Sequence, residues 1–184
     1  MPDRIWTASN FLSFFRALLV VPTSYCIVTE FPGNRLWAAV FITIAVASDF
    51  LDGYLARQLH QVSEFGKILD PLADKIAAGV VSAALVWVGE TPPWFFAAIV
   101  GRDLLIVLGG VYIRKKKKIV VQSNWPGKIA VSAIALYIFL STLRVESLEP
   151  ARSFALWFSV ALMTLSIVMY AQRLFIGRNI ETTG

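Results

Sequence analysis

Four aspartates lie within one short stretch of the chain, "SDFLDGYLARQLHQVSEFGKILDPLADK", which covers residues 48–75. Asp49 and Asp52 are three residues apart, and Asp70 and Asp74 are four apart, so each pair shares a face if its segment is helical. Four carboxylates packed together repel one another and cannot all stay ionised unaided. Divalent cations would remove this conflict, and an oxygen-only ligand set suits Mg²⁺ or Mn²⁺. Two such ions about 3.5–4 Å apart are a common arrangement for phosphoryl chemistry.

A structural interpretation of the same aspartates treats them as helix-end residues. Asp70 and Asp74 are expected near a helix N-terminus, where acids are mildly favoured. Asp49 and Asp52 are expected near a helix C-terminus, where the helix dipole disfavours acids. The structural interpretation therefore leaves the first pair unexplained, and a metal site is favoured.

The residues between the two pairs fit a nucleotide. Gly53 and Gly66 would let a ligand approach the backbone, and Ala56 is a small residue close to Gly53 on the helix surface. Arg57 offers a fork of donors that suits a diphosphate. Each glycine alone would more often be a helix-packing residue, but together with the carboxylates these residues indicate a binding site.

The composition is typical of a membrane protein. Of the 184 residues 57% are hydrophobic, and the mean hydropathy of +0.67 is too high for a soluble domain of this size. A membrane-spanning helix needs about 20 mostly apolar residues. No linker divides the chain, so we expect one all-α integral membrane domain over residues 1–184. Six spans are predicted, at residues 10–30, 36–56, 68–89, 93–113, 126–144 and 152–172.

The distribution of positive charge predicts the orientation of these spans, because cytoplasmic loops carry an excess of Lys and Arg. Basic residues, Arg16 among them, concentrate towards the two termini, in the loop at 57–67 and in the stretch at 114–128. Both termini and the aspartates are therefore expected on the cytoplasmic side. The net charge of +5, with "RKKKK" at 114–118, is expected to hold the chain against anionic lipids, not nucleic acid.

The single cysteine and the single histidine exclude several kinds of metal site. Cys26 has no second cysteine with which to form an intramolecular disulfide, and His60 alone cannot build a histidine-rich zinc site. Any bound metal is therefore expected to be a hard, oxygen-liking ion.

The spacing of the aspartates, glycines, alanine and arginine resembles the signature of the CDP-alcohol phosphotransferase family. The first span, with "NFLSFFRALLVVP" at 10–22, is similar to the first helix of bacterial members, and six spans are typical of the family fold. Eight residues separate Arg57 from Gly66, as the signature requires. The matching positions are Asp49, Asp52, Gly53, Ala56, Arg57, Gly66, Asp70 and Asp74.

The resemblance implies a function and a set of site residues. The donor would be CDP-diacylglycerol, the second substrate a polar alcohol, and CMP the leaving group. Asp74 would be the general base and, with Asp49, Asp52 and Asp70, would bind two ions of Mg²⁺ or Mn²⁺. A homodimer in the bacterial cytoplasmic (inner) membrane is also implied. The CDP-lipid site would consist of Asn10, Ser13, Asp49, Asp52, Gly53, Ala56, Arg57, Ser63 and Gly66.

The acceptor alcohol is predicted from shorter stretches. The N-terminal segment and "EFGKILDPLADK" at 64–75 are most similar to family members that use glycerol 3-phosphate. "GRDLLIV" at 101–107 resembles members that use phosphatidylglycerol, and inositol phosphate is a third acceptor in the family. An anionic acceptor needs basic partners, for which the candidates are Lys128, Arg102 and Arg114.

Arg102 and Asp103 lie near the middle of the fourth predicted span. Adjacent residues of a helix do not face each other, so we expect each to have a different partner. Arg102 either binds the acceptor phosphate or belongs to a structural ion pair, and Asp103 is expected to be structural.

Two other classes of membrane protein place carboxylates in the bilayer. An ion transporter would usually have them near the midplane, whereas these aspartates cluster at one face with an arginine and glycines. An intramembrane aspartyl protease needs only two aspartates and leaves Arg57 without a role. Metal-dependent CMP release would distinguish an enzyme from a transporter.

Overall fold

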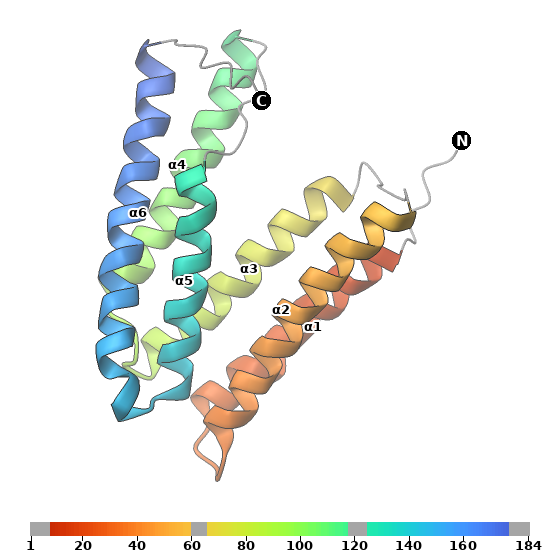
Figure 1. The fold of residues 1–184 in the computed structure, drawn as a ribbon, viewed down its shortest axis with the longest axis vertical. Helices are drawn as coiled ribbons and strands as arrows, with labels where there is room; N and C mark the ends of the chain where they lie inside the picture. The colour runs from red at the N-terminus through yellow and green to blue at the C-terminus, as the bar shows by residue number, and fades with distance from the viewer. Residues whose placement is uncertain (1–7, 60–65, 118–124, 177–184) are drawn as a thin grey trace. The chain divides into compact units, whose positions relative to one another are not determined.

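The computed structural model describes residues 8–59, 66–117 and 125–176, and the side chains of 14–49, 74–109 and 125–172. Within those ranges all regular secondary structure is helical, which confirms the predicted all-α class (Figure 1). The six long helices follow the six predicted spans in order. They are α1 (Ala8–Val28), α2 (Asn34–Leu59), α3 (Gly66–Trp87), α4 (Pro93–Lys117), α5 (Trp125–Leu143) and, after a 3₁₀ turn η1 (Glu146–Leu148), α6 (Glu149–Ile176).

Two helices continue into stretches that the sequence assigns to loops. Helix α2 extends to Leu59 and α4 to Lys117, because Arg, Gln, Leu and Lys are good helix formers even where the apolar stretch has ended. Asp52 therefore lies seven residues before the end of α2, and the expectation that Asp49 and Asp52 are near a helix C-terminus is wrong.

The second pair of aspartates is also away from a helix end. Asp70 is the fifth residue of α3 and Asp74 the ninth, whereas the helix dipole acts within the first and last turns. The helix-end interpretation therefore explains neither pair.

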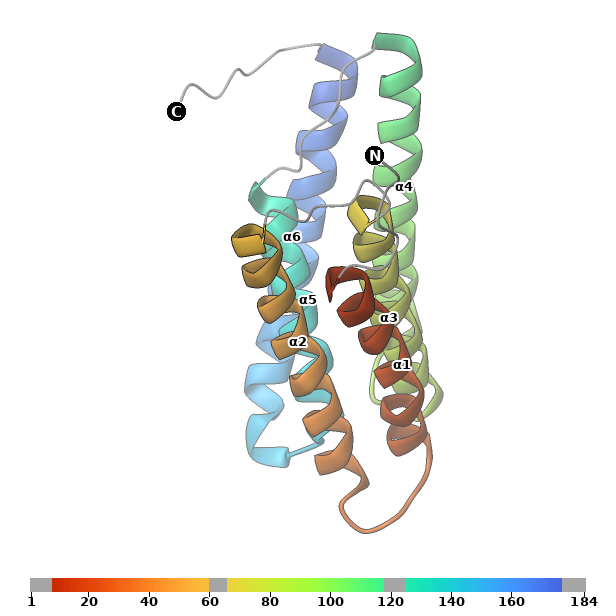
Figure 2. The same cartoon turned by 90° about the vertical axis from the view of Figure 1, so that its right-hand side faces the viewer.

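Contacts group the chain into two compact units, residues 1–92 with 138–145 and residues 93–137 with 146–184. In the first unit α1 packs against both α2 and α3 (Figures 1 and 2). The buried side chains of this unit include Ile27 of α1, Ala38 and Ala39 of α2, and Leu85 of α3. Small residues such as the two alanines let helix backbones approach closely, as is common between membrane helices.

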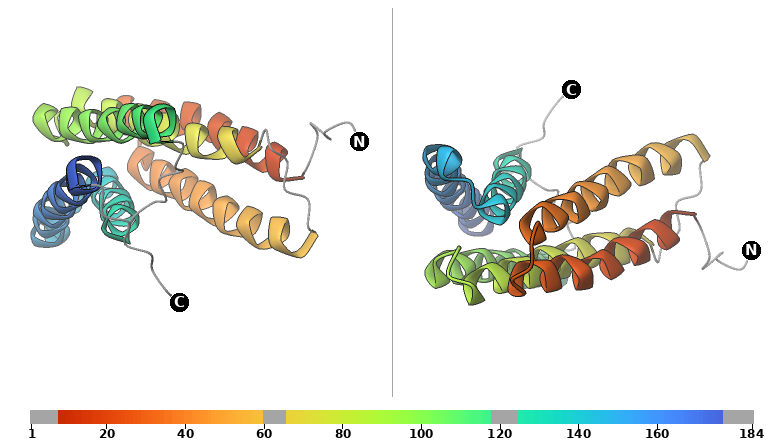
Figure 3. Two further views of the ribbon diagram at one scale, coloured as in Figure 1. Left: turned by 90° about the horizontal axis from the view of Figure 1, so that it is seen from above. Right: turned by 90° about the horizontal axis from the view of Figure 1, so that it is seen from below.

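In the second unit α4 packs against α6 (Figure 3). The rings of Trp94 in α4 and Trp157 in α6 lie 6.0 Å apart between centroids. Phe95 of α4 meets Tyr137 of α5 edge to face at 4.8 Å, an arrangement that suits the charge distribution of aromatic rings. These aromatic contacts connect α4 to α6 and to the part of α5 that belongs to this unit.

Two helices in the described ranges are long and apolar enough to cross a membrane, Trp125–Leu143 and Glu146–Gln172. A shorter apolar stretch covers Phe14–Val28. Two such helices do not by themselves establish membrane spans. The six spans and the cytoplasmic position of both termini therefore stay predictions, as does the single domain.

A second charged group, the Glu90 cluster, consists of Glu90, Arg35 and Arg144 and lies at the turn after α3. The turn uses Gly89 at a φ of 79°, a conformation that glycine adopts without strain. An oxygen of the Glu90 carboxylate is 2.8 Å from Nε of Arg144 and 4.0 Å from Nη2 of Arg35. The cluster ties the end of α3 to the start of α2 and to the residue that follows α5.

Candidate metal and nucleotide site

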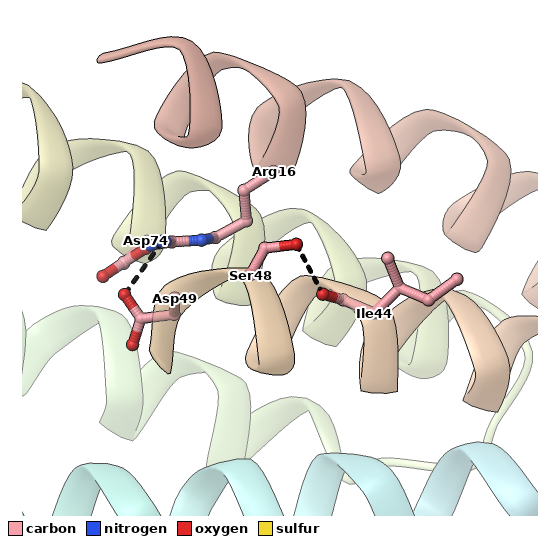
Figure 4. Close-up of polar contacts among 5 residues, drawn as sticks. All are labelled: Arg16, Ile44, Ser48, Asp49 and Asp74. Carbon is pink, nitrogen blue, oxygen red and sulfur yellow. Dashed lines mark hydrogen bonds and ion pairs between the residues drawn. The ribbon is translucent and has the colours of Figure 1, made fainter. Parts of the chain in front are cut away.

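Arg16 of α1 lies where α1, α2 and α3 meet. Its Nη2 is 2.9 Å from Oδ1 of Asp49, and its Nη1 donates a hydrogen bond to Oδ1 of Asp74 (Figure 4). The arginine side chain is only 6% exposed. Arg16, Asp49 and Asp74, here called the Arg16 cluster, therefore connect three helices through one guanidinium.

The two carboxylates of the Arg16 cluster differ from the arginine in exposure. The Asp49 side chain is 62% exposed and that of Asp74 is 46% exposed. Two carboxylates thus face one guanidinium, and both carboxylates are more accessible than the guanidinium. The structure thus brings together one aspartate from each predicted pair.

The packing of α2 explains why Asp49 is accessible. Ser48 is buried, and its hydroxyl donates to the carbonyl oxygen of Ile44 at 2.8 Å (Figure 4). Successive residues are about 100° apart around a helix, so the residue after a buried position lies at the border of the packed face. Asp49 occupies that border, close enough to reach Arg16 and still open to a ligand.

Arg16 is the site residue that the sequence reasoning missed. The charge count places it among the basic residues of the cytoplasmic side, but the structure buries it in the third turn of α1. Its position inside the predicted span 10–30 was the available signal, because an ionisable residue within a membrane span usually has a function or a partner.

For the remaining predicted site residues the structure describes the backbone and not the side chain, except for Ser63, which lies outside the described residues. Asn10 and Ser13 are in α1, and the others are in α2 and α3 on the chain segments next to Asp49 and Asp74. These residues of α2 and α3 are Asp52, Gly53, Ala56, Arg57, Gly66 and Asp70.

The donor atoms of the Arg16 cluster fit a hard divalent cation. Among the described side chains no group of three or more His, Cys, Asp or Glu residues lies together, and that part of the chain contains two of the four predicted ligands. Asp49 and Asp74 supply carboxylate oxygens, the ligands that Mg²⁺ and Mn²⁺ prefer. The guanidinium between them shows that this position stabilises positive charge.

Arg102 makes its contacts within the second unit. It is buried, with Nη1 2.9 Å from Oδ1 of Asp103 and Nη2 3.2 Å from the carbonyl oxygen of Gly127. Arg102 has another partner in Gly127, as expected, but it also contacts Asp103, contrary to expectation, because the long arginine side chain folds back to its neighbour. The bond to Gly127 joins α4 to the first turn of α5.

The two other candidate acceptor residues are at helix ends. Lys128 follows Gly127 in α5, is exposed, and has its Nζ 5.9 Å from the ring centroid of Trp125. Such a cation over an indole ring is weakly attracted and keeps its charge available. Arg114 is near the end of α4, and its side chain lies outside the described ranges.

Comparisons with known proteins all point to one family. The profile of the family described as CDP-alcohol phosphatidyltransferase matches residues 6–170. The CDP-diacylglycerol–glycerol-3-phosphate 3-phosphatidyltransferase of Aquifex aeolicus is 36% identical over 110 residues, which span 59% of this chain and 60% of that protein. The protein of the same name in Bacillus subtilis is 32% identical over 142 residues, 73% of this chain and 72% of that protein. A cardiolipin synthase (CMP-forming) of Streptomyces coelicolor is 34% identical over 133 residues, 70% of this chain and 61% of that protein.

Proposed function

Because the chain belongs to the CDP-alcohol phosphatidyltransferase family, we propose that it transfers a phosphatidyl group from CDP-diacylglycerol to glycerol 3-phosphate and releases CMP. The observation that carries the proposal is the meeting of Asp49 and Asp74, from two helices, with their carboxylates exposed and held by one buried arginine. The relatives named for this activity support the choice of donor and acceptor.

The metal site is proposed to consist of Asp49, Asp52, Asp70 and Asp74. Asp52 lies about one helical turn after Asp49 in α2, and Asp70 about one turn before Asp74 in α3. Both are therefore nearer to the connection between the two helices than the described aspartates are. Mg²⁺ or Mn²⁺ bound there would neutralise the diphosphate and the charge that develops on CMP. The carboxylates would hold the ions and so help to position the phosphorus that is attacked.

Asp74 is proposed as the general base. The acceptor hydroxyl forms a bond to the phosphorus that carries diacylglycerol, and the bond from that phosphorus to the CMP oxygen breaks. The hydroxyl proton passes to the Asp74 carboxylate, which must lie within hydrogen-bond reach of the acceptor. The 46% exposure of the Asp74 side chain leaves room for that approach.

The nucleotide would bind along α2 and its neighbours. Arg57 is proposed to hold the diphosphate through paired hydrogen bonds, and Gly53, Ala56 and Gly66 to let the cytidine approach the helices. Asn10 and Ser13 of α1, together with Ser63, are proposed to complete this site.

The acceptor phosphate is proposed to bind Lys128, Arg102 and Arg114. The exposed ammonium of Lys128 supports this assignment most directly. Phosphatidylglycerol is the second candidate acceptor, which the similarity to the Streptomyces cardiolipin synthase supports. Inositol phosphate is an acceptor elsewhere in the family and belongs in the same test.

The protein is proposed to be an integral protein of the bacterial cytoplasmic membrane with six spans, both termini and the Arg16 cluster on the cytoplasmic side. Its long helices have 19 to 28 residues, and about 20 are needed to cross the hydrocarbon core. Large apolar side chains such as Phe14, Leu108 and Trp157 are 61%, 64% and 65% exposed, and lipid contact would cover them. A homodimer is proposed on the family resemblance.

The direct test is CMP release by the purified protein from CDP-diacylglycerol with Mg²⁺ or Mn²⁺. Glycerol 3-phosphate, inositol phosphate, serine and phosphatidylglycerol are supplied one at a time, with EDTA as the metal-free control. Turnover with glycerol 3-phosphate alone is expected. Turnover with another acceptor would keep the chemistry and replace the acceptor, and metal-independent or absent CMP release would contradict the proposal.

A further inference from the structure

The role of Arg16 is open, because the proposed reaction assigns it none. Its guanidinium is buried, and it contacts the two described aspartates of the proposed metal site through one oxygen of each, Oδ1. A buried charge is tolerated only when it is paired and hydrogen-bonded. Arg16 therefore depends for its own burial on an ion pair with Asp49 and a hydrogen bond to Asp74.

The exposures of the three side chains indicate from which side a ligand can reach the carboxylates. Arg16 is 6% exposed, whereas the two carboxylates are 62% and 46% exposed. The guanidinium lies on the protein side of the carboxylates, and a cation from the cytoplasm would approach from the opposite side. Carboxylates that bind metals are commonly oriented by hydrogen-bond donors outside the ligand shell.

We propose that Arg16 is a positioning residue of the metal site, which holds Asp49 and Asp74 from the buried side and orients their carboxylates towards the bound ion. The inference rests on the proposed metal site and adds a residue from α1 to it. The fork of an arginine can bond two carboxylates at once, which a single ammonium does with less directional control.

A competing account has Arg16 occupy the place of the metal and leave when the ion binds. Departure would strip a nearly enclosed guanidinium of both carboxylate partners, which is strongly unfavourable. The competing account predicts that removing Arg16 strengthens metal binding, whereas a positioning role predicts that it weakens binding. The sign of the change therefore distinguishes the two.

The experiment measures Mn²⁺ binding to the purified full chain by the electron paramagnetic resonance signal of free Mn²⁺, without substrates. Arg16→Gln is expected to weaken Mn²⁺ affinity about 10- to 100-fold, the range found when an outer partner of a metal ligand is removed. Arg16→Lys is expected to fall between this variant and the wild type. Arg144→Gln, which removes an arginine–carboxylate contact from the Glu90 cluster, is the matched control and should bind Mn²⁺ as the wild type does.

Thermal unfolding without metal accompanies each binding curve, because a purely structural role would lower stability and leave Mn²⁺ affinity alone. Affinity of Arg16→Gln within about twofold of the wild type, or tighter, would overturn the inference while leaving the metal site intact. If Arg16→Gln does not fold, Arg16→Lys carries the same test, and wild-type affinity in that variant would overturn the inference. A wild type that does not bind Mn²⁺ would overturn the metal site and the inference together.

Discussion

The Arg16 cluster and the Glu90 cluster of the first unit contain the same chemical groups in opposite arrangements. The Arg16 cluster has one buried arginine and two exposed aspartates. The Glu90 cluster has one carboxylate that is 9% exposed and two arginines, of which Arg35 is 17% and Arg144 is 63% exposed. Each cluster connects separate segments of the chain.

The difference shows how a ligand site can be told from a structural ion group. In the Glu90 cluster the acid is enclosed and contacts two arginines, so its carboxylate is hardly accessible to a metal cation. In the Arg16 cluster the arginine is enclosed and both carboxylates are accessible. The accessibility of the carboxylates, more than the presence of ion pairs, therefore favours the Arg16 cluster as the proposed cation-binding site.

The largest effect is expected for Asp74→Asn. Asparagine has nearly the same shape but cannot accept the acceptor's proton, so turnover should fall about 10²- to 10⁴-fold. Binding of the CDP-lipid should stay close to that of the wild type. Near-normal CMP release by the variant would remove Asp74 from the role of base.

Arg57→Ala tests whether the nucleotide binds next to the Arg16 cluster, and so sharpens the comparison of that cluster with the Glu90 cluster. Hydrogen bonds to charged groups contribute about 1.5–3 kcal/mol, so CDP-lipid affinity should weaken about 10- to 100-fold. Equilibrium binding of the CDP-lipid measures this directly. Arg57→Lys keeps the charge without the fork and should be intermediate, whereas an unchanged affinity of Arg57→Ala would count against a diphosphate contact.

Glu90→Gln tests the structural side of the comparison. The substitution removes the carboxylate that Arg35 and Arg144 both contact, so the free energy of unfolding should fall by about 1–3 kcal/mol. Thermal unfolding in detergent measures the loss, and Mn²⁺ affinity should be unchanged below the unfolding temperature. A large loss of Mn²⁺ affinity would mean that the two clusters do not have separate roles.

Arg144→Gln should have the smallest effect. The Arg144 side chain is 63% exposed, and exposed ion pairs contribute about 0–1 kcal/mol. Arg144 has a φ of 51°, and glutamine would experience the same backbone strain, so the change isolates the ion pair. A loss of stability as large as that of Glu90→Gln would show that Arg144, and not Arg35, is the main partner of Glu90.

The helices were predictable from the sequence because apolar stretches of about 20 residues alternate with turns rich in proline, glycine and charge. Their ends were less predictable, since α2 and α4 continue through polar residues that favour helix. Hydropathy marks the end of an apolar stretch, but the backbone hydrogen bonds of the helix continue beyond it, so hydropathy places the helix end too early.

The candidate site was predictable in part. The spacing places Asp49 and Asp74 on consecutive helices, and the structure brings both carboxylates to Arg16 of α1, against which α2 and α3 each pack. Arg16 was not predictable as their partner, because the sequence does not say which face of α1 meets α2 and α3. The pairing of Arg102 with Asp103 was not predictable, because it depends on the conformation of the long arginine side chain. The rule that adjacent residues of a helix point in different directions does not describe that conformation.

The central claim is that the exposed carboxylates of the Arg16 cluster, and not the enclosed one of the Glu90 cluster, carry a metal-dependent transfer. The most direct test is CMP release from CDP-diacylglycerol and glycerol 3-phosphate by Asp49→Asn and Glu90→Gln, measured side by side over a range of Mn²⁺ concentrations. Asp49→Asn should lose turnover or need far more Mn²⁺, and Glu90→Gln should follow the wild-type curve below its unfolding temperature. Wild-type Mn²⁺ dependence in Asp49→Asn would contradict the claim.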